Sequence, residues 1–243
     1  MILDNDSGTD PYAPHCCKFL CLLTLIVPNF SYGQNAPVVV ELFSSQGCSS
    51  CPPADEYLVE LAQQRDIIAL GWHVDYWDYI GWADGFAHPA FTERQKAYAR
   101  ALDERMIYTP QFIINGVESS FGGQRTEVAS VIQKYAQLPP GAELSIRRMG
   151  SSYEITLQNA YYAGPYDVRL VGVSPLQTVD IHSGENAGRQ VDYANIVTEW
   201  HNLGLWDGLW PTTFETGVLG PDRYVVLVQY QDNGEIVIAD WVN

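Results

Sequence analysis

The chain has 243 residues, of which 47% are hydrophobic and 17% are charged, and its formal net charge at pH 7 is −16. A chain of this size and apolar content can bury a hydrophobic core, which excludes extensive disorder. The acidic balance excludes a protein that binds nucleic acid by neutralising phosphates, and one that docks on anionic lipid through a basic patch. We interpret the excess of acidic residues as a means of keeping the protein soluble.

Residues 1–36 are predicted to be a signal peptide followed by an unstructured start. The uncharged apolar run at 19–28 is about half as long as a bilayer-spanning helix, and it fits the apolar region of a signal peptide. Lys18 precedes this run as the basic residue, although the start of the chain is acidic and therefore atypical. Pro28 at the end of the run argues against a buried helix. We expect a periplasmic or secreted protein that does not insert into the membrane once the leader is removed.

The cysteine positions are informative once a leader is assumed. Three of the five cysteines, at positions 16, 17 and 21, lie in the leader, so the mature chain keeps Cys48 and Cys51. A disulfide between residues three apart closes too small a loop to stabilise a fold by restricting the unfolded chain. The pair is therefore predicted to serve redox chemistry or to bind a metal.

The segment 37–138 is predicted to be an α/β domain with the cysteines at a strand-to-helix turn. Apolar runs, helical periodicity and turn residues predict the following order: a strand at 38–43, a helix at 54–64, a strand at 67–74, an insertion at 75–90, a helix at 91–104, strands at 111–114 and 117–121, and a helix at 126–137. This order is typical of a thioredoxin-like domain.

The character of the sequence changes after a predicted linker at 138–141. In the segment 142–243, short alternating apolar runs are separated by turn residues, as in an antiparallel sandwich. The predicted fold class is therefore an α/β thioredoxin-like domain followed by a smaller, sandwich-like all-β domain.

Cys48 and Cys51 are the predicted catalytic pair. A thiolate is stabilised at a helix N-terminus, and a separation of three residues lets the second sulfur resolve a mixed disulfide formed by the first. We expect Cys48 to be the more exposed nucleophile and Cys51 the buried resolving cysteine. Structural zinc sites normally need a second pair of ligands, and the mature sequence has no second Cys-x-x-Cys.

Thr109 and Pro110 are the second part of the predicted site. A cis proline before the strand at 111–114 would face the cysteines and leave the backbone of Thr109 open to a substrate. Glu41, on the strand that leads to the cysteines, has two interpretations of equal weight. It is either a buried carboxylate that accepts the proton of Cys51 or a strand-edge side chain that faces solvent.

His73 and His88 supply an alternative, metal-binding interpretation. Together with Cys48 and Cys51 they would form a soft-metal site, because thiolates and imidazoles suit copper(I). A lone histidine is more often simply hydrogen-bonded, and this is the default interpretation of His73. The aromatic residues of the insertion at 75–90 have two interpretations, a lid over the cysteines or packing of the insertion onto the domain.

Four blocks of sequence, at 40–55, 73–82, 108–116 and 184–189, carry a family resemblance as a set. Together they resemble the DUF1223 family of thioredoxin-like exported bacterial proteins. The resemblance covers about residues 37–243, and it implies a thioredoxin-like domain with a β-rich C-terminal domain. It implies no settled activity.

The leading functional hypothesis is a periplasmic or secreted thiol–disulfide oxidoreductase that acts on protein thiols or disulfides, or on a redox partner protein, without a cofactor. The sequence leaves open whether this protein would act as a reductant, an oxidant or an isomerase. One alternative is a protein that binds or delivers copper or another soft metal through the same cysteines. The other is a non-catalytic binding module whose C-terminal part holds a partner.

Overall fold

The computed structural model describes residues 36–217, 219–220 and 222–242. Residues 1–35, which hold nearly all of the predicted leader and three of the cysteines, lie outside the described residues, so export stays a prediction. None of the helices in the described ranges is long and apolar enough to cross a membrane.

The first part of the described chain alternates strands and helices. Its elements are β1 (Val38–Ser44), α1 (Pro52–Leu61), β2 (Ile67–His73), η1 (Asp78–Ile80), α2 (Pro89–Ala101), β3 (Gln111–Ile114), β4 (Glu118–Phe121) and α3 (Arg125–Tyr135). Pro52 begins α1 and Pro89 begins α2, at positions where the missing N–H costs no helical hydrogen bond. The individual strands and helices predicted between residues 38 and 137 are confirmed in type and order.

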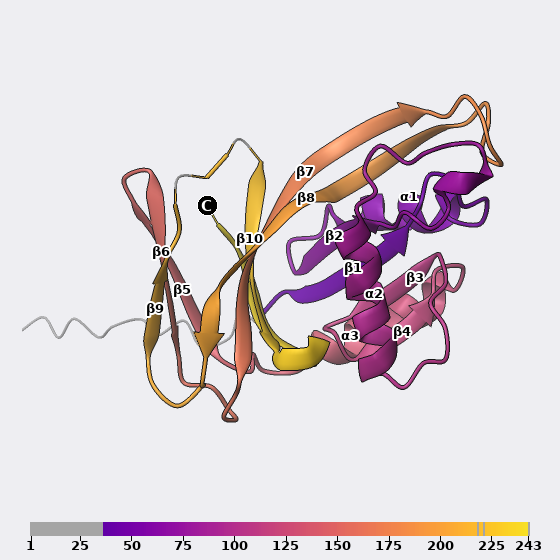
Figure 1. Cartoon of the computed structure of the whole chain (residues 1–243). Helices are drawn as coiled ribbons and strands as arrows, with labels where there is room; N and C mark the ends of the chain where they lie inside the picture. Colours follow the sequence, from indigo (N-terminus) through magenta and orange to yellow (C-terminus); the bar gives the residue numbers. More distant parts are fainter. Residues whose placement is uncertain (1–35, 218, 221, 243) are drawn as a thin grey trace, which may run out of the picture. The chain divides into compact units, whose positions relative to one another are not determined.

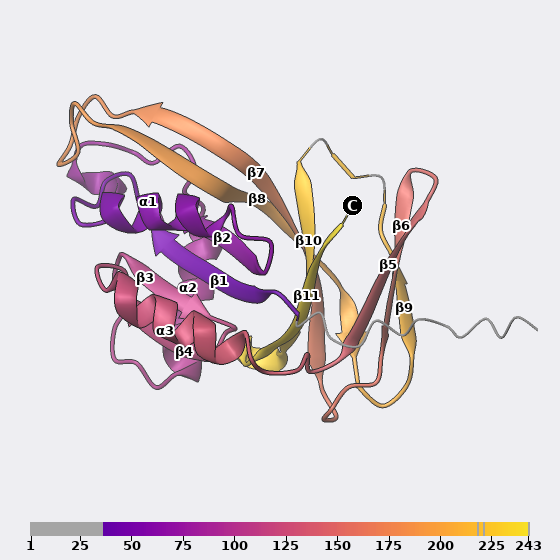
Figure 2. The same ribbon diagram turned by 180° about the vertical axis from the view of Figure 1, so that it is seen from behind.

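Strand β1 is the centre of this part of the sheet. It pairs in parallel with β2 and antiparallel with β3, which in turn pairs with β4. Every residue of β1 is buried, as expected for a strand that is covered on both faces. Val39 and Phe43 pack on the face that α2 covers (Figure 1), whereas Val40 and Leu42 pack on the face that α1 and α3 cover (Figure 2).

The rest of the chain is almost entirely strand. Its elements are β5 (Glu143–Met149), β6 (Ser152–Gln158), β7 (Tyr166–Asp180), β8 (Gln190–Trp206), β9 (Thr212–Glu215), β10 (Arg223–Tyr230), η2 (Gln231–Asn233) and β11 (Ile236–Val242). The long strands β7 and β8 form an antiparallel pair with two register shifts. Such irregularities bend a strand, and Figure 1 shows the pair curving from β10 toward β2.

The predicted fold class is wrong. The described residues form an eight-stranded mixed sheet in the order β11-β10-β7-β8-β2-β1-β3-β4, a three-stranded sheet in the order β5-β6-β9, and three α-helices. The protein is therefore mostly β, and it is not an α/β thioredoxin-like domain followed by a small all-β domain. Strands that were expected to form a separate layer instead continue the sheet of β1 and β2.

The physical reason lies where β8 meets β2. Gly71 of β2 pairs in parallel with Ile196 of β8, and a Cβ at position 71 would lie 3.2 Å from the carbonyl oxygen of Ala194, so glycine permits the close approach. The side-chain amide of Asn195 donates to the carbonyl of Ala69 at 2.9 Å. An uncovered strand edge leaves backbone groups unpaired, and β8 covers that of β2. Because the Asn195–Ala69 contact joins residues 126 positions apart, local periodicity does not reveal it.

The three-stranded sheet packs against the C-terminal strands of the large sheet. Ile155 and Leu157 of β6 share an apolar cluster with Val168 of β7 and Val226 of β10. Alternating side chains on facing strands produce this cluster, in the way that sheets pack face to face. The sandwich-like pattern in the second half of the sequence therefore reports real sheet packing, although one of the two sheets is shared with the first half.

Candidate functional site

Cys48 and Cys51 form a disulfide in the turn between β1 and α1, and their Cα atoms are 5.4 Å apart. Two backbone hydrogen bonds shape this turn. The N–H of Cys48 donates to the carbonyl of Ser45 at 3.1 Å, and the N–H of Cys51 donates to the carbonyl of Cys48 at 3.2 Å. Helix α1 then begins at Pro52. The predicted placement of the cysteine pair at a strand-to-helix turn is confirmed.

Both cysteines are buried, with exposed fractions of 1% for Cys48 and 0% for Cys51. The two residues between them, Ser49 and Ser50, are exposed. The hydroxyl of Ser50 lies 3.4 Å from Sγ of Cys48 and donates to the carbonyl of Thr109 at 3.5 Å. The expected difference in exposure between the two cysteines is therefore absent from the disulfide form, and a reagent reaches Cys48 only after a local movement.

Thr109 and Pro110 lie beside the disulfide turn, and the peptide bond between them is cis, as predicted. The Thr109 hydroxyl accepts a hydrogen bond from the indole N–H of Trp77 at 2.7 Å. A Cβ at Gly122 would lie 2.6 Å from Cβ of Pro110 and 2.9 Å from Cβ of Ala54, so Pro110 packs close to the first turn of α1. The structure thus brings Thr109 and Pro110 to the cysteines.

Glu41 is buried, as one of its two interpretations requires, but its carboxylate does not face the cysteines. It forms a fully buried ion pair with Arg94 of α2, with Nε–Oε1 at 2.8 Å and Nη2–Oε2 at 3.0 Å. The hydroxyl of Tyr98 also donates to Oε2. The carboxylate therefore points toward α2, on the face of the sheet opposite to α1. Both of its oxygens have charged or hydroxyl partners, so Glu41 is not available as a proton acceptor for Cys51.

His73, the last residue of β2, forms a buried ion pair with Asp84, with Nδ1–Oδ2 at 2.6 Å. Burial opposes a charge on His73, but the charge and hydrogen bond of Asp84 and the charge of Asp55 outweigh it and raise the pKa of His73. Burial also opposes ionisation of Asp84, but His73 and the N–H groups of Gln46 and Phe86 outweigh it and lower the pKa of Asp84. The pair is therefore favoured in its charged form.

Asp55 is a functional candidate that the sequence analysis did not identify. It lies in the first turn of α1, one turn after Cys51, and its exposed fraction is 3%. Burial raises the pKa of Asp55 to about 7, although the charge of His73 and the nearby Ser44 hydroxyl oppose the shift. Oδ2 of Asp55 has no hydrogen-bond partner among the described residues. A carboxyl group that titrates near neutrality beside the disulfide turn is suited to exchanging protons with it.

The sequence does carry a signal for Asp55. Asp55 and Leu58 belong to the buried stripe of α1, and an acidic residue on the apolar stripe of a helix is seldom fully buried without a function or a partner. Asp55 is recognisable in the sequence as the charged residue that interrupts the apolar stripe of this helix.

Two segments that are distant in sequence hold the loop that precedes the disulfide. Asn186, between β7 and β8, donates to the carbonyls of Gln46 at 2.9 Å and Cys48 at 2.8 Å. The indole N–H of Trp82 donates to Oε1 of Gln46 at 2.8 Å, and Oδ2 of Asp84 accepts from the N–H of Gln46 at 2.8 Å. The sequence blocks at 73–82 and 184–189 therefore meet at this loop.

The aromatic insertion packs onto the fold, as one of its two interpretations predicts, and it also lies against the loop that carries Cys48. A Cβ at Gly47 would lie 3.2 Å from Cβ of Trp77 and 3.5 Å from Cδ1 of Ile80, so the insertion covers the disulfide loop. Phe86 packs edge-on against His73, with ring centroids 5.2 Å apart, and so anchors the insertion to the sheet. The insertion is both packed onto the fold and positioned over the loop that carries Cys48.

The family model described as "Protein of unknown function (DUF1223)" matches residues 39–229. The chain belongs to the DUF1223 family. The resemblance found in the sequence is thereby confirmed. No curated protein matches the sequence significantly.

This DUF1223 chain is similar to two solved structures. Protein AGR_C_4864 from Agrobacterium tumefaciens is 33% identical, with a TM-score of 0.75 over 86% of this chain and 96% of that one. HBP35 of Porphyromonas gingivalis is 13% identical, with a TM-score of 0.58 over 86% of this chain and 75% of that one. The second similarity concerns the fold alone.

The residues of the alternative metal site do not converge in this DUF1223 chain. His73 is engaged by Asp84, and Nδ1 of His88 accepts from the N–H of Ala90 at 3.1 Å as the N-terminal cap of α2. Within residues 36–217, 219–220 and 222–242, no group of three or more His, Cys, Asp and Glu side chains is arranged to hold a metal ion. This geometry does not favour the copper-binding alternative.

Proposed function

We propose that this DUF1223 protein is an exported thiol–disulfide oxidoreductase that uses Cys48 and Cys51. The observation that carries the proposal is the Cys48–Cys51 disulfide at the start of α1, with the exposed Ser50 linking it to the backbone of Thr109. Its substrates are protein thiols or disulfides, or the cysteines of a redox partner protein.

The proposed reaction is thiol–disulfide exchange in two steps. In the reduced protein the Cys48 thiolate attacks one sulfur of a substrate disulfide, which forms a mixed disulfide and releases the other substrate sulfur as a thiolate. The Cys51 thiolate then attacks Sγ of Cys48, closes the Cys48–Cys51 disulfide and releases the second substrate sulfur. Two electrons pass from the protein to the substrate, and the reverse sequence oxidises a substrate dithiol.

The first turn of α1 supports a thiolate in an unusual way. Pro52 and Pro53 have no N–H, and the N–H groups of Ala54 and Asp55 both donate to the carbonyl of Cys51, at 2.8 and 3.1 Å. The backbone therefore has few free donors to offer a sulfur. Stabilisation of a Cys48 thiolate falls to the helix dipole and to the Ser50 hydroxyl, 3.4 Å from Sγ, once this hydroxyl turns its proton from the carbonyl of Thr109 to the sulfur.

Asp55 is the proposed proton acceptor for Cys51. A thiol must lose its proton before it attacks a disulfide, and a buried carboxyl with a pKa raised to about 7 by desolvation can take up that proton near neutral pH. Asp55 follows Cys51 by four residues, so the two side chains share one face of the helix. His73 and Asp84 are buried near Asp55, and their charges act on its pKa in opposite directions.

The test is catalysis of insulin reduction by dithiothreitol, with the full chain, Cys48→Ser, Cys51→Ser and the matched control Ser49→Ala. We expect Cys48→Ser to reduce the rate to the uncatalysed level and Ser49→Ala to retain the wild-type rate. Cys51→Ser should accumulate a mixed disulfide with insulin, visible by mass spectrometry, because the resolving sulfur is missing. Equal rates for Cys48→Ser and wild type would sink the proposal.

A further inference from the structure

A cavity of about 460 Å³ lies at the end of β1 that is remote from the disulfide. Val39 and Asn115 line it on the β1 side, β11 contributes residues 236–239, and Tyr161 and Tyr162 line it from the segment before β7. Cavities of this size accept small organic ligands. Because β1 rises about 3.3 Å per residue, five residues of strand separate the cavity from the disulfide turn by roughly 16 Å.

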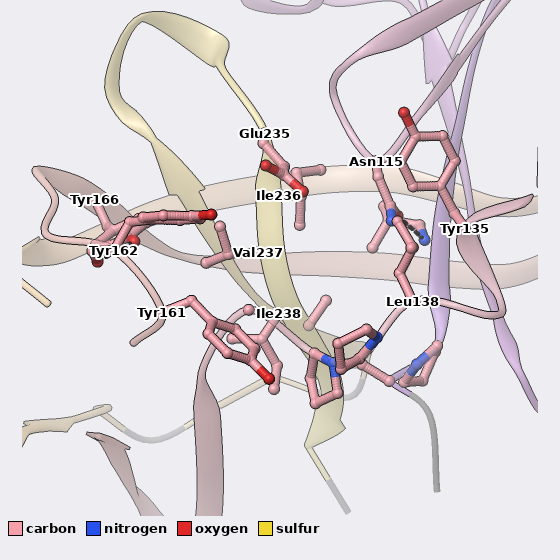
Figure 3. A pocket seen from close by; sticks show the side chains of 17 residues that line it. Asn115, Tyr135, Leu138, Tyr161, Tyr162, Tyr166, Glu235, Ile236, Val237 and Ile238 are labelled. Atoms are coloured by element: carbon pink, nitrogen blue, oxygen red, sulfur yellow. Dashed lines mark hydrogen bonds between the residues drawn. The ribbon is translucent and has the colours of Figure 1, made fainter. Parts of the chain in front are cut away.

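The walls of this cavity are rich in tyrosine. Figure 3 shows Tyr161, Tyr162 and Tyr166 on one side of β11 and Tyr135 on the other. Tyr161 and Tyr162 are 66% and 75% exposed, so much of their ring surface is open to a ligand. Their faces carry the negative part of the ring quadrupole, which attracts cations.

The segment that carries these rings is held in place. The N–H of Tyr161 donates to the carbonyl of Gly141 at 2.9 Å, and the hydroxyl of Tyr166 donates to the carbonyl of Tyr162 at 2.7 Å. Opposite them, the hydroxyl of Tyr135 donates to Glu118 at 2.9 Å. These contacts fix the backbone at Tyr161 and Tyr162 and the hydroxyls of Tyr166 and Tyr135. Part of the cavity wall is therefore ordered before any ligand arrives, which lowers the ordering cost of binding.

Glu235 supplies the charge at the mouth of the cavity. Its carboxylate has no hydrogen bond or ion pair with any described residue, and the residues that line the cavity include no lysine, arginine or histidine. Glu235 is an exposed residue, although partial burial of its carboxyl raises the pKa of Glu235. When ionised, its negative charge lies at the cavity without a compensating cationic side chain. A bound cation would relieve this and would also contact the tyrosine faces.

We infer that this cavity binds an organic cation, an amine or quaternary ammonium group attached to a small apolar body. The apolar side chains of β11 would hold the body, and Glu235 with the neighbouring tyrosine rings would hold the charged group. The inference is independent of the cysteine chemistry, because no residue of the disulfide loop lines the cavity.

The test is isothermal titration of the full chain with choline and with 3,3-dimethyl-1-butanol, an uncharged isostere in which carbon replaces the ammonium nitrogen. We expect saturable choline binding at one site and binding of the isostere that is weaker by about tenfold or more. Glu235→Gln should weaken choline about tenfold without changing the isostere, and Tyr161→Ala should weaken choline as well. Glu185→Gln, an exposed acidic residue away from the cavity, is the matched control and should bind choline like the wild type.

The pH dependence gives a second readout. Choline affinity of the wild type should rise with pH as Glu235 ionises, whereas Glu235→Gln should lack this rise. The inference is overturned if choline does not saturate the wild-type chain, if choline and its isostere bind equally, or if Glu235→Gln matches the wild type in affinity and pH dependence.

Discussion

Glu41 and Asp55 are buried carboxylates on opposite faces of the sheet, and their partners give them different roles. The carboxylate of Glu41 forms a bidentate ion pair with the guanidinium of Arg94, so the positive charge of Arg94 compensates its negative charge. Asp55 has no such partner, because the nearby His73 is engaged by Asp84. The difference, together with the raised pKa of Asp55, is why we assign the proton transfer to Asp55 and not to the predicted Glu41.

Asp55 makes the stability of the protein depend on pH. Burial raises the pKa of Asp55 from 3.8 to about 7, so the folded state holds a proton that the unfolded state has lost, and stability falls as the pH rises from about 4 to about 7. Asp55→Asn removes this titration. In urea unfolding of the oxidised proteins, the free energy of unfolding of the variant relative to that of the wild type should therefore increase by about 4 kcal/mol between about pH 4 and about pH 8.

The exposed residue Asp66 provides the control for this experiment, since Asp66→Asn should leave the pH dependence unchanged. Asp55→Asn also introduces a buried amide. Its effect on the free energy of unfolding does not depend on pH, so it cancels when the values at two pH values are compared. Parallel stability curves for Asp55→Asn and wild type across this range would refute the raised pKa.

At the scale of elements, the disulfide loop owes its position to a hairpin far away in sequence. The tip between β7 and β8 places the Asn186 amide on the carbonyls of Gln46 and Cys48, and η1 with its flanking tryptophans covers the same loop. Both cysteines are buried as a result, so the accessibility of Cys48 depends on how firmly these elements hold the loop.

Asn186→Ala is expected to make the disulfide easier to reduce. It removes two hydrogen bonds to the loop backbone, each contributing about 1 kcal/mol, so local opening becomes more frequent. The rate of reduction by dithiothreitol, followed by thiol quantification, should increase about thirtyfold. Glu185→Ala changes the exposed neighbouring residue of the same tip and should reduce at the wild-type rate, and an unaltered rate in Asn186→Ala would exclude the clamping role.

At the scale of the whole molecule, a buried polar network connects two strands of the eight-stranded sheet, β1 and β10, that are not neighbours. Arg94 of α2 pairs with Glu41 of β1 and donates to Gln229 of β10 at 3.3 Å and Asn233 of η2 at 3.4 Å. Gln229 in turn donates to the hydroxyl of Tyr98 at 2.9 Å. Helix α2 is thereby attached both to the β1 half of the sheet and to its C-terminal strands.

Breaking this network one partner at a time should be costly. Glu41→Gln or Arg94→Met leaves a buried group without its charged partner, which destabilises a fold by about 3–5 kcal/mol. The double variant should lose much less than the sum of the two, because neither charge is then left alone. Urea unfolding of the four proteins measures the coupling.

The exposed pair Glu93 and Lys96 on the same helix is the matched control. Its Nζ–Oε1 distance is 2.8 Å, but solvent-exposed pairs contribute at most about 1 kcal/mol, so Glu93→Gln should have little effect. Additive losses in the Glu41 and Arg94 cycle would show that the two side chains act independently, contrary to the geometry.

Much of the local structure was predictable from the sequence. The apolar run of β1, the prolines that begin α1, and Asn115-Gly116 between β3 and β4 all act over a few residues, and each corresponds to the predicted element. The cysteine turn was predictable for the same reason. The position of Thr109 and Pro110 beside it joins residues 59 positions apart, and it was predicted from the order of the surrounding strands and helices. The fold class was not predictable. Side chains alternate in the same way along a strand that extends an existing sheet and along a strand that forms a new one.

The sequence by itself thus determined the disulfide pair, the elements around it and the membership of the DUF1223 family. Only the tertiary structure decided that β8 covers the edge of β2, that Asn186 holds the backbone of Cys48, and that Asp55 rather than Glu41 is the uncompensated acid. The contacts of β8 and Asn186 join residues 126 and 138 positions apart. The protonation of a carboxyl depends on what desolvates it and what charge faces it, and those neighbours are assembled by packing rather than by local sequence.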